Sequence, residues 1–308
     1  MYLGEGDCGC ASHLDLVTEL VLQALYSGVL TGSSYALIAL GLALVFGTMK
    51  VINLAHGELV LLAAYIAYTC ESAFGFNPLL AIPAAIVLVC IATMLTYALV
   101  SRIGTDRELN SLLLTYGLGV MLTNGALLLW KADIRSTKSA WLQEAVVMGP
   151  FYSMRSELLF FVVSLALIAA LWWWLARTWA GRAVRAVASN REAAKLMGID
   201  PHRVELVSFV VAGLLAAFAG IAIFSFGVIQ PSLGTSLTIK AFIITVLAGM
   251  GSVPGVLVGA LLLGITESLT TTFFSSALQE LAGMVLFLLV LFVLPNGLFG
   301  TRWRRRVR

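Results

Sequence analysis

The sequence predicts an all-α fold, a polytopic bundle of eight to ten transmembrane helices. Of its 308 residues, 60% are apolar and only 11% are charged, whereas soluble globular proteins carry about 25% charged residues. The mean hydropathy is +0.98, and the alternation typical of membrane-spanning strands is missing. Because lipid offers the backbone no hydrogen bonds, helices remain as the spanning elements. A soluble enzyme is excluded, and the net charge of +3 is too small to indicate a nucleic-acid partner.

Long uncharged runs mark the individual spans, since about 18 apolar residues suffice to cross a bilayer. Some of these runs are long enough to contain a turn between two spans. The segments FGFNP at 74–78 and GMGSVPG at 249–255 contain helix-breaking glycine and proline, which predicts turns there. The uncharged runs cover residues 20–49, 72–101, 109–130, 158–176, 206–239, 241–266 and 281–301.

The uneven distribution of basic residues predicts the orientation. Of the 19 Lys and Arg residues, five lie in 302–308 and six in 177–203. By the positive-inside rule, both segments face the cytoplasm. The expected organisation is a short N-terminal extension at 1–19, a membrane domain at 20–300 with a cytoplasmic loop at about 178–203 and a long outer loop at 130–157, and a basic cytoplasmic tail at 301–308.

No catalytic constellation is apparent in the sequence. The motifs HExxH and GxSxG are missing, and the lack of any Gly-Lys dipeptide rules out a GxxxxGK[ST] nucleotide-binding loop. Cys8 and Cys10 lie close to His13, but no further ligand completes a metal site, so free thiols are the favoured interpretation. We therefore expect no catalytic site, no metal site and no cofactor. If ATP drives this protein, partner subunits must bind it.

The cytoplasmic loop is the most informative polar segment. Arg182 and Arg185 alternate with small residues, which predicts a short amphipathic helix that Gly198 caps and Pro201 follows. Two interpretations are open. The loop is either a solvated connection whose arginines set the topology, or a docking helix for a cytoplasmic partner.

A family resemblance rests on four motifs that occur in order along the chain. EAA at 192–194, followed by Gly198, resembles the loop through which permeases of ABC importers contact their ATPases. The longer stretch RAVASNREAAKLMGID resembles the permeases of branched-chain amino acid ABC transporters, of the LivH type. The supporting segments are GSSYALIALGLALVFGTMKVINLAHGEL at 32–59, AFIITVLAGMGSVPGVLVGALLLGITES at 241–268 and LPNGLFG at 294–300. The first 20 or so residues depart from the pattern.

The resemblance implies an ABC importer permease fold in the bacterial inner membrane. It also implies a set of partners: a LivM-like second permease, two cytoplasmic ABC ATPases that bind the ATP, and an extracytoplasmic substrate-binding protein. Transport would follow alternating access, driven by ATP-dependent closure of the ATPase pair. The residues that map onto the ATPase-docking loop and its flanks are Arg182, Arg185, Asn190, Arg191, Glu192, Ala193, Ala194 and Gly198.

Several polar residues lie near membrane depth, where a charge costs roughly 2.5–3.5 kcal/mol on insertion scales. They line the translocation pathway or lock the two halves together, or else they lie at span ends near the interface. For Lys240 the span-end interpretation is favoured, and for His56 and Glu58 both stay open. The segment around Asn53 follows an expected helix end, and broken helices often mark transporter sites. The candidates are Asn53, His56, Gly57, Glu58, Lys240 and Glu267.

Other functions remain as alternatives. The chain could be a permease of the same family for urea, short amides or other amino acids, because no feature of the sequence separates these substrates from branched-chain amino acids. An ion-coupled secondary transporter would need several carboxylates inside the spans, and few are present.

Glycines at 213, 220 and 227 predict close helix packing.

Overall fold

The computed structural model describes residues 7–75, 77–104, 107–149, 151–249 and 252–299. The expected basic tail at 301–308 and the side chains of Cys8 and Cys10 lie outside the described part. The described helices of the bundle are α1 (Asp7–Met49), α2 (His56–Phe74), α3 (Ile82–Val100), α4 (Arg107–Trp130), α6 (Arg155–Arg177), α9 (Pro201–Phe226), α10 (Leu233–Ala248), α11 (Val253–Phe273) and α12 (Gln279–Val293). Short 3-10 turns, η1 (Pro78–Ala81) and η2 (Ser276–Leu278), precede α3 and α12.

The bundle agrees with the predicted eight to ten spans. Within the described residues, seven helical segments are long and apolar enough to cross a membrane. They are α1, η1 with α3, α4, α6, α9, α11, and η2 with α12. Two further bundle helices are α2, with 19 residues, and α10, with 16. Both are shorter than α1; the first turn of α2 is buried, whereas that of α10 is only partly buried.

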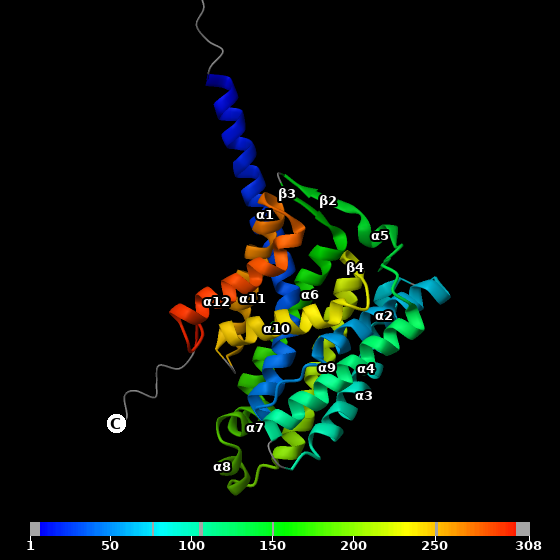
Figure 1. Cartoon of the computed structure of the whole chain (residues 1–308), viewed down its shortest axis with the longest axis vertical. Helices are drawn as coiled ribbons and strands as arrows, with labels where there is room; N and C mark the ends of the chain where they lie inside the picture. The colour runs from blue at the N-terminus through cyan, green and yellow to red at the C-terminus, as the bar shows by residue number, and fades with distance from the viewer. Residues whose placement is uncertain (1–6, 76, 105–106, 150, 250–251, 300–308) are drawn as a thin grey trace, which may run out of the picture.

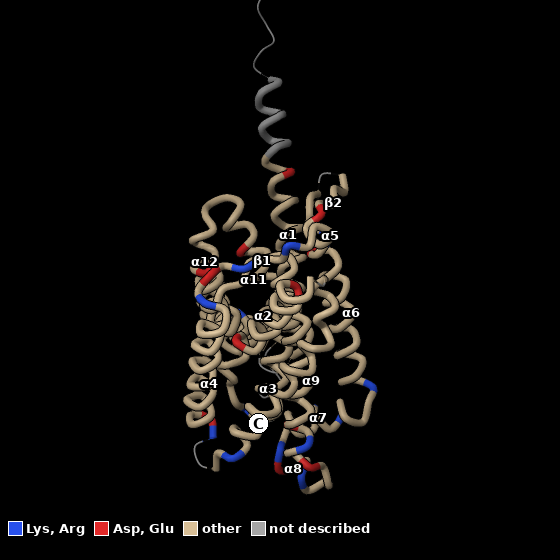
Figure 2. The backbone as a smooth tube through the Cα atoms, turned by 90° about the vertical axis from the view of Figure 1, so that its right-hand side faces the viewer, with Lys and Arg blue, Asp and Glu red and all other residues tan. Residues whose placement is uncertain are grey.

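Two ends of the bundle are distinct (Figure 1). The loop end carries the short helices α7 (Trp179–Ser189) and α8 (Arg191–Leu196), and the hairpin end carries α5 (Ala140–Gln143) with β2 (Ala145–Met148) and β3 (Phe151–Met154). Lys and Arg gather around α7, α8 and the nearby end of α4 (Figure 2). This clustering matches the basic loop that the sequence predicts to be cytoplasmic.

The segment 130–157 has more structure than the outer loop expected from sequence. Strands β2 and β3 pair antiparallel, with Ala145 opposite Met154. The Gln23 side chain of α1 holds the hairpin edge, because it donates to the Tyr152 carbonyl at 2.6 Å and accepts from the Tyr152 amide at 3.0 Å. A second small pair joins β1 (Arg135–Ser136) to β4 (Val228–Ile229). The hairpin end is therefore tied to α1 and to the chain after α9.

Helix α1 continues without a break across the boundary expected at residue 19. The segment expected as an extension is helical from Asp7 onward and leads directly into the first span. The two predicted turns are confirmed. Helix α2 ends at Gly75 in the left-handed region, φ +66°, and Asn77 caps the turn before α3. Helix α10 ends at Gly249, and Ser252 caps α11 through the Gly255 amide.

Glycines allow the central helices to approach backbone to backbone, as their spacing predicts. A Cβ at Gly28 of α1 would lie 2.6 Å from the Ile265 Cα of α11. A Cβ at Gly220 of α9 would lie 2.1 Å from the Val60 carbonyl oxygen of α2. Close packing of this kind holds helices together in lipid, because the hydrophobic effect does not drive their association there. Gly227, the third glycine of the predicted series, ends α9 as its C-cap.

We predict that Gly28→Ala destabilises the bundle and Gly47→Ala does not. Both glycines lie on α1, but a Cβ at Gly47 meets no atom within 4 Å, whereas at Gly28 it meets backbone. Overpacking of this kind costs roughly 1–3 kcal/mol. Thermal unfolding of the detergent-purified variants measures the difference. Equal midpoints for the two variants would contradict the close α1–α11 contact.

Candidate functional site

The loop between α6 and α9 folds into an amphipathic helix laid against the bundle. Helix α7 begins where the Thr178 side chain accepts from the Gly181 amide at 3.0 Å. Gly181 and Val184 are buried, whereas Arg182 and Arg185 are exposed. The pattern confirms the amphipathic helix, whose basic face points away from the core.

The expected single helix is in fact two helices, and Asn190 is the reason. Its backbone is extended, and its side chain accepts from the Ala193 amide at 3.0 Å, which starts α8 as a new helix. Gly198 ends the segment with φ +82°, where its amide donates to Lys195 and the next amide donates to Ala194. Gly198 therefore has the capping role that the sequence predicts. Pro201 opens α9 at its first turn.

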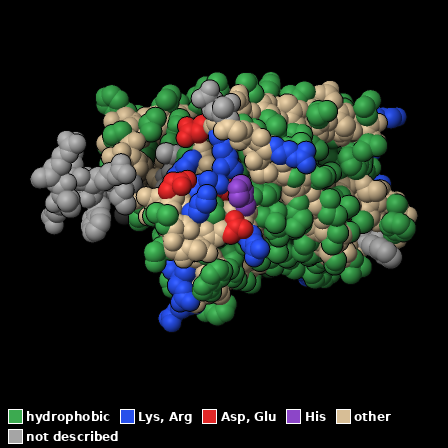
Figure 3. All heavy atoms as spheres, turned by 90° about the horizontal axis from the view of Figure 1, so that it is seen from below, with side chains coloured by type: hydrophobic (Ala, Val, Ile, Leu, Met, Phe, Trp, Pro, Cys, Tyr) green, Lys and Arg blue, Asp and Glu red, His purple; other side chains and the backbone are tan. Residues whose placement is uncertain are grey.

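Helix α8 offers a small mixed surface at the loop end. Ala194 is buried and anchors the helix, while Glu192 and Ala193 are exposed. Leu196 and Met197 are 87% and 82% exposed, although both are large and apolar. Viewed from this end, charged and histidine side chains form a polar patch bordered by hydrophobic ones (Figure 3). Exposed apolar side chains within a charged patch are typical of a protein–protein contact.

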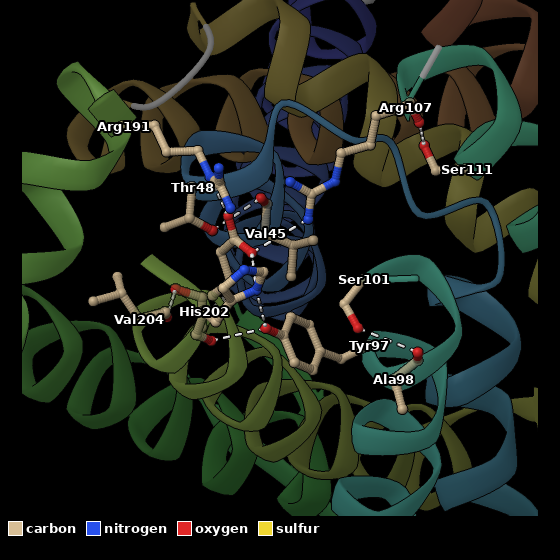
Figure 4. A network of polar contacts seen from close by, with 12 residues as sticks. Val45, Thr48, Tyr97, Ala98, Ser101, Arg107, Ser111, Arg191, His202 and Val204 are labelled. Atoms are coloured by element: carbon tan, nitrogen blue, oxygen red, sulfur yellow. Dashed lines mark hydrogen bonds and ion pairs between the residues drawn. The ribbon is translucent and has the colours of Figure 1, made fainter. Parts of the chain in front are cut away.

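A buried carboxylate connects α8 to two membrane helices. Glu205 of α9 is fully buried. It accepts from Arg191 Nε at 2.8 Å and from Arg107 Nη2 at 3.2 Å, at the starts of α8 and α4 (Figure 4). Nearby, the Tyr97 hydroxyl of α3 donates to the His202 carbonyl at 2.8 Å. One carboxylate thus joins the candidate docking helix to α4 through two charge-assisted hydrogen bonds.

Sequence reasoning missed Glu205 and Arg107. Arg191 was assigned to the docking loop, but its partner lies fourteen residues later, directly before the uncharged run at 206–239. The signal that could have found it is a lone carboxylate in the opening turns of a span that follows a basic loop. Such a charge needs a partner when it is buried.

Helix α2 begins inside the bundle, directly after the non-helical segment 50–55. Its entry is held by side chains: Asn53 Oδ1 accepts from the Ala55 amide at 3.1 Å, and Thr115 Oγ1 accepts from the Leu54 amide at 3.1 Å. Thr238 Oγ1 of α10 accepts from the Gly57 amide at 2.8 Å. The predicted helix break at Asn53–Gly57 is therefore present, and polar side chains satisfy its free amides.

Three of the candidate pathway residues serve this break. Asn53 and His56 are each 1% exposed. The His56 Nε2 atom lies 2.9 Å from the Ile38 carbonyl oxygen of α1. A Cβ at Gly57 would lie 2.0 Å from the Gly234 carbonyl oxygen, so the starts of α2 and α10 touch. The structure gives these residues a role in packing and backbone satisfaction.

Glu58 differs from its neighbours because it borders open space. It is 4% exposed and accepts from Thr235 Oγ1 at 3.2 Å. In the part of the chain that the structure describes, no basic nitrogen lies within 4.0 Å of its carboxylate. A cavity of about 140 Å³ lies beside it, between α2 and α4.

Lys240 and Glu267 form a polar lock between helices. Lys240 Nζ lies 2.7 Å from Glu267 Oε2, and the same oxygen accepts from the Tyr35 hydroxyl at 2.8 Å and from Gln279 Nε2 at 2.7 Å. These four residues come from α10, α11, α1 and α12. The span-end interpretation of Lys240 stays a prediction: the residue lies in the middle of α10, while Gln279, which binds the same carboxylate, opens α12. The Lys240 ammonium is paired with the buried Glu267.

We predict that Lys240→Met destabilises the protein more than the double change Lys240→Met/Glu267→Gln does. The single change leaves a carboxylate that is 2% exposed without its cation, and breaking a buried pair costs about 3–5 kcal/mol. The double change removes both charges. Thermal unfolding in detergent distinguishes the variants. Equal stability of the single variant and the wild type would show that the pair does not hold these helices together.

Comparisons with known proteins agree with this architecture. Residues 24–294 match the family model described as "Branched-chain amino acid transport system / permease component". The chain is 31% identical to the high-affinity branched-chain amino acid transport system permease protein LivH of Escherichia coli strain K12. The alignment covers 91% of this chain and 95% of that protein. The permease protein BraD of Pseudomonas aeruginosa shows the same identity and coverage.

More distant similarities extend further. The ribose import permease protein RbsC of Escherichia coli strain K12 is 28% identical, over 84% of this chain and 81% of that protein. Among solved structures, PsaBC from Streptococcus pneumoniae in complex with Fab has a TM-score of 0.53 at 13% identity. That similarity covers 89% of this chain and 92% of the other and concerns the fold alone.

Proposed function

Since this chain belongs to the family of branched-chain amino acid transport system permease components, we propose that it is a membrane-spanning subunit of an ATP-driven importer of leucine, isoleucine and valine. The observation that carries this proposal is the match over nearly the whole membrane domain, to permease relatives named for these substrates. The chain is a multi-pass protein of the inner membrane with seven long apolar helices in its described part. Its task is transport and not catalysis.

The proposal requires other subunits. The sequence contains no Gly-Lys dipeptide, so the ATP must be bound by two ABC ATPases that dock from the cytoplasm. The exposed face of α8 supports this contact, because Glu192, Leu196 and Met197 project from a helix that Glu205 holds rigidly to the bundle. A LivM-like second permease and an extracytoplasmic binding protein complete the importer. The tail at 301–308 is rich in arginine, as is the loop that contains α7 and α8, so the positive-inside rule assigns both to the cytoplasm.

Reconstituted uptake tests the proposed function. The complete importer is placed in proteoliposomes with ATP inside and binding protein outside, and radiolabelled leucine is offered. We expect uptake that requires every subunit and that vanadate abolishes. Unlabelled urea and acetamide are added as competitors of leucine uptake, because they represent the alternative substrates. Ribose is added as well, because the chain is similar to a ribose permease. Uptake by this chain alone that a protonophore abolishes would favour an ion-coupled transporter instead.

We predict that the double change Leu196→Asp/Met197→Asp separates the permease from its ATPases. The two side chains are exposed, so folding and insertion should be unaffected, whereas two charges in an apolar contact should lower ATPase retention about tenfold or more. Co-purification of the ATPases with the tagged permease measures the effect. Val147→Asp serves as the control, because Val147 is 69% exposed but lies on β2 at the hairpin end. Normal retention by the double variant would remove α8 from the docking surface.

A further inference from the structure

We propose that the cavity between α2 and α4 is a binding site for the amino acid in transit, with Glu58 as the ligand of its ammonium group. This inference rests on the proposed function and deepens it. The ligand class is a free α-amino acid with an aliphatic side chain. The permease would then bind the substrate specifically, in addition to the selection made by the extracytoplasmic binding protein.

The walls of the cavity suit an aliphatic side chain. They are formed on α2 by residues that include Leu61, Leu62 and Tyr65, and on α4 by residues that include Met121 and Gly125. The volume of about 140 Å³ far exceeds the roughly 10–15 Å³ that one water molecule needs by this measure. Apolar walls with a few placed polar groups are typical of small-molecule sites.

The carboxylate of Glu58 is prepared to receive a cation. It lies in the first turn of α2 and touches Gly234 in the first turn of α10, where a Cβ would lie 2.0 Å from Glu58 Oε2. Both helix starts stabilise a negative charge without neutralising it. The hydroxyls of Thr235 and Thr123 occupy two lone pairs of the Glu58 carboxylate, whereas an ionised carboxylate offers about four acceptor sites. An ammonium can therefore bind the remaining sites.

One residue of the cavity wall carries a second polar group that lacks a partner. The Tyr65 hydroxyl is buried without a hydrogen bond, on a side chain that is 1% exposed. Its ring is fixed by stacking on Trp130 at a centroid distance of 4.6 Å. Buried hydroxyls are rarely left unpaired. Tyr65 lies two helical turns after Glu58 on the same side of α2, so a zwitterion in the cavity offers it a carboxylate while Glu58 holds the ammonium.

The cavity lies at the free face of α4. Met121 and Leu129 belong to its walls and are 72% and 73% exposed in the isolated chain. A second permease packed on this face would close the cavity laterally and leave it within the pathway between the two subunits. Helix α4 is thus both a wall of the site and a boundary of the chain.

A filled cavity provides the test, and the chain offers a matched control. Gly125 lines the cavity and Gly117 does not; both lie on α4, and a Cβ at either meets no atom within 4 Å. The complete importer with Gly125→Leu or Gly117→Leu is reconstituted with ATP inside, and leucine uptake, valine uptake and ATP hydrolysis are measured together. Glu58→Gln is compared with Glu108→Gln, an exposed carboxylate of α4.

We expect Gly125→Leu to raise the ATP hydrolysed per leucine about tenfold or more and to lower leucine uptake about threefold more than valine uptake, because leucine is the larger ligand. Glu58→Gln should raise the same ratio for both amino acids, and the two controls should stay within about twofold of wild type. Wild-type ratios for Gly125→Leu or Glu58→Gln, or an equal effect of Gly117→Leu, would overturn the site while wild-type uptake still supports the proposed function. A wild-type importer that carries neither amino acid would overturn the proposed function itself.

Discussion

The structure depends on one constraint, which is that α2 begins inside the bundle, where protein groups must satisfy its first amides. The solution is local and specific. Thr238 accepts from the Gly57 amide, Thr115 accepts from the Leu54 amide, and Asn53 accepts from the Ala55 amide. The two helix starts touch at Gly57 and Gly234, where a side chain on either residue would collide with the other helix. The arrangement of α1, α4 and α9 around this point follows, because each must supply a hydroxyl, a carbonyl or a glycine surface.

Three carboxylates that are buried in the described part of the chain have different surroundings. Glu205 has two arginines, and Glu267 has a lysine and two neutral donors. Both are paired with cations, and both connect helices that are far apart in sequence. Glu58 is held by hydroxyl groups and by two helix starts, and it borders a cavity. A balanced pair fixes geometry, whereas an unbalanced charge beside open space favours a cationic ligand.

Much of the fold could be predicted from sequence, because lipid imposes simple rules. The spans follow from uncharged length, the turns at 74–78 and 249–255 from glycine and proline, and the end of α8 from Gly198. The candidate sites were harder, because their geometry depends on partners distant in sequence. Glu205 binds Arg107 and Arg191, which lie 98 and 14 residues before it, and Lys240 binds Glu267, which lies 27 residues later. Neither signal is periodic, so neither is visible in the pattern of apolar residues.

Helix α4 connects the two candidate sites. Its first residue, Arg107, binds the carboxylate that also binds Arg191 of α8, and its later turns form one wall of the Glu58 cavity. A helix moves largely as a rigid rod, so a displacement of α8 that is carried through Glu205 reaches Met121 and Gly125 without any change in the residues between. A partner bound at α8 can shift the cavity only if it binds the two conformations of the bundle with different free energies. The Arg191–Glu205–Arg107 contact is the connection in the structure through which a force applied at α8 would reach the walls of the cavity.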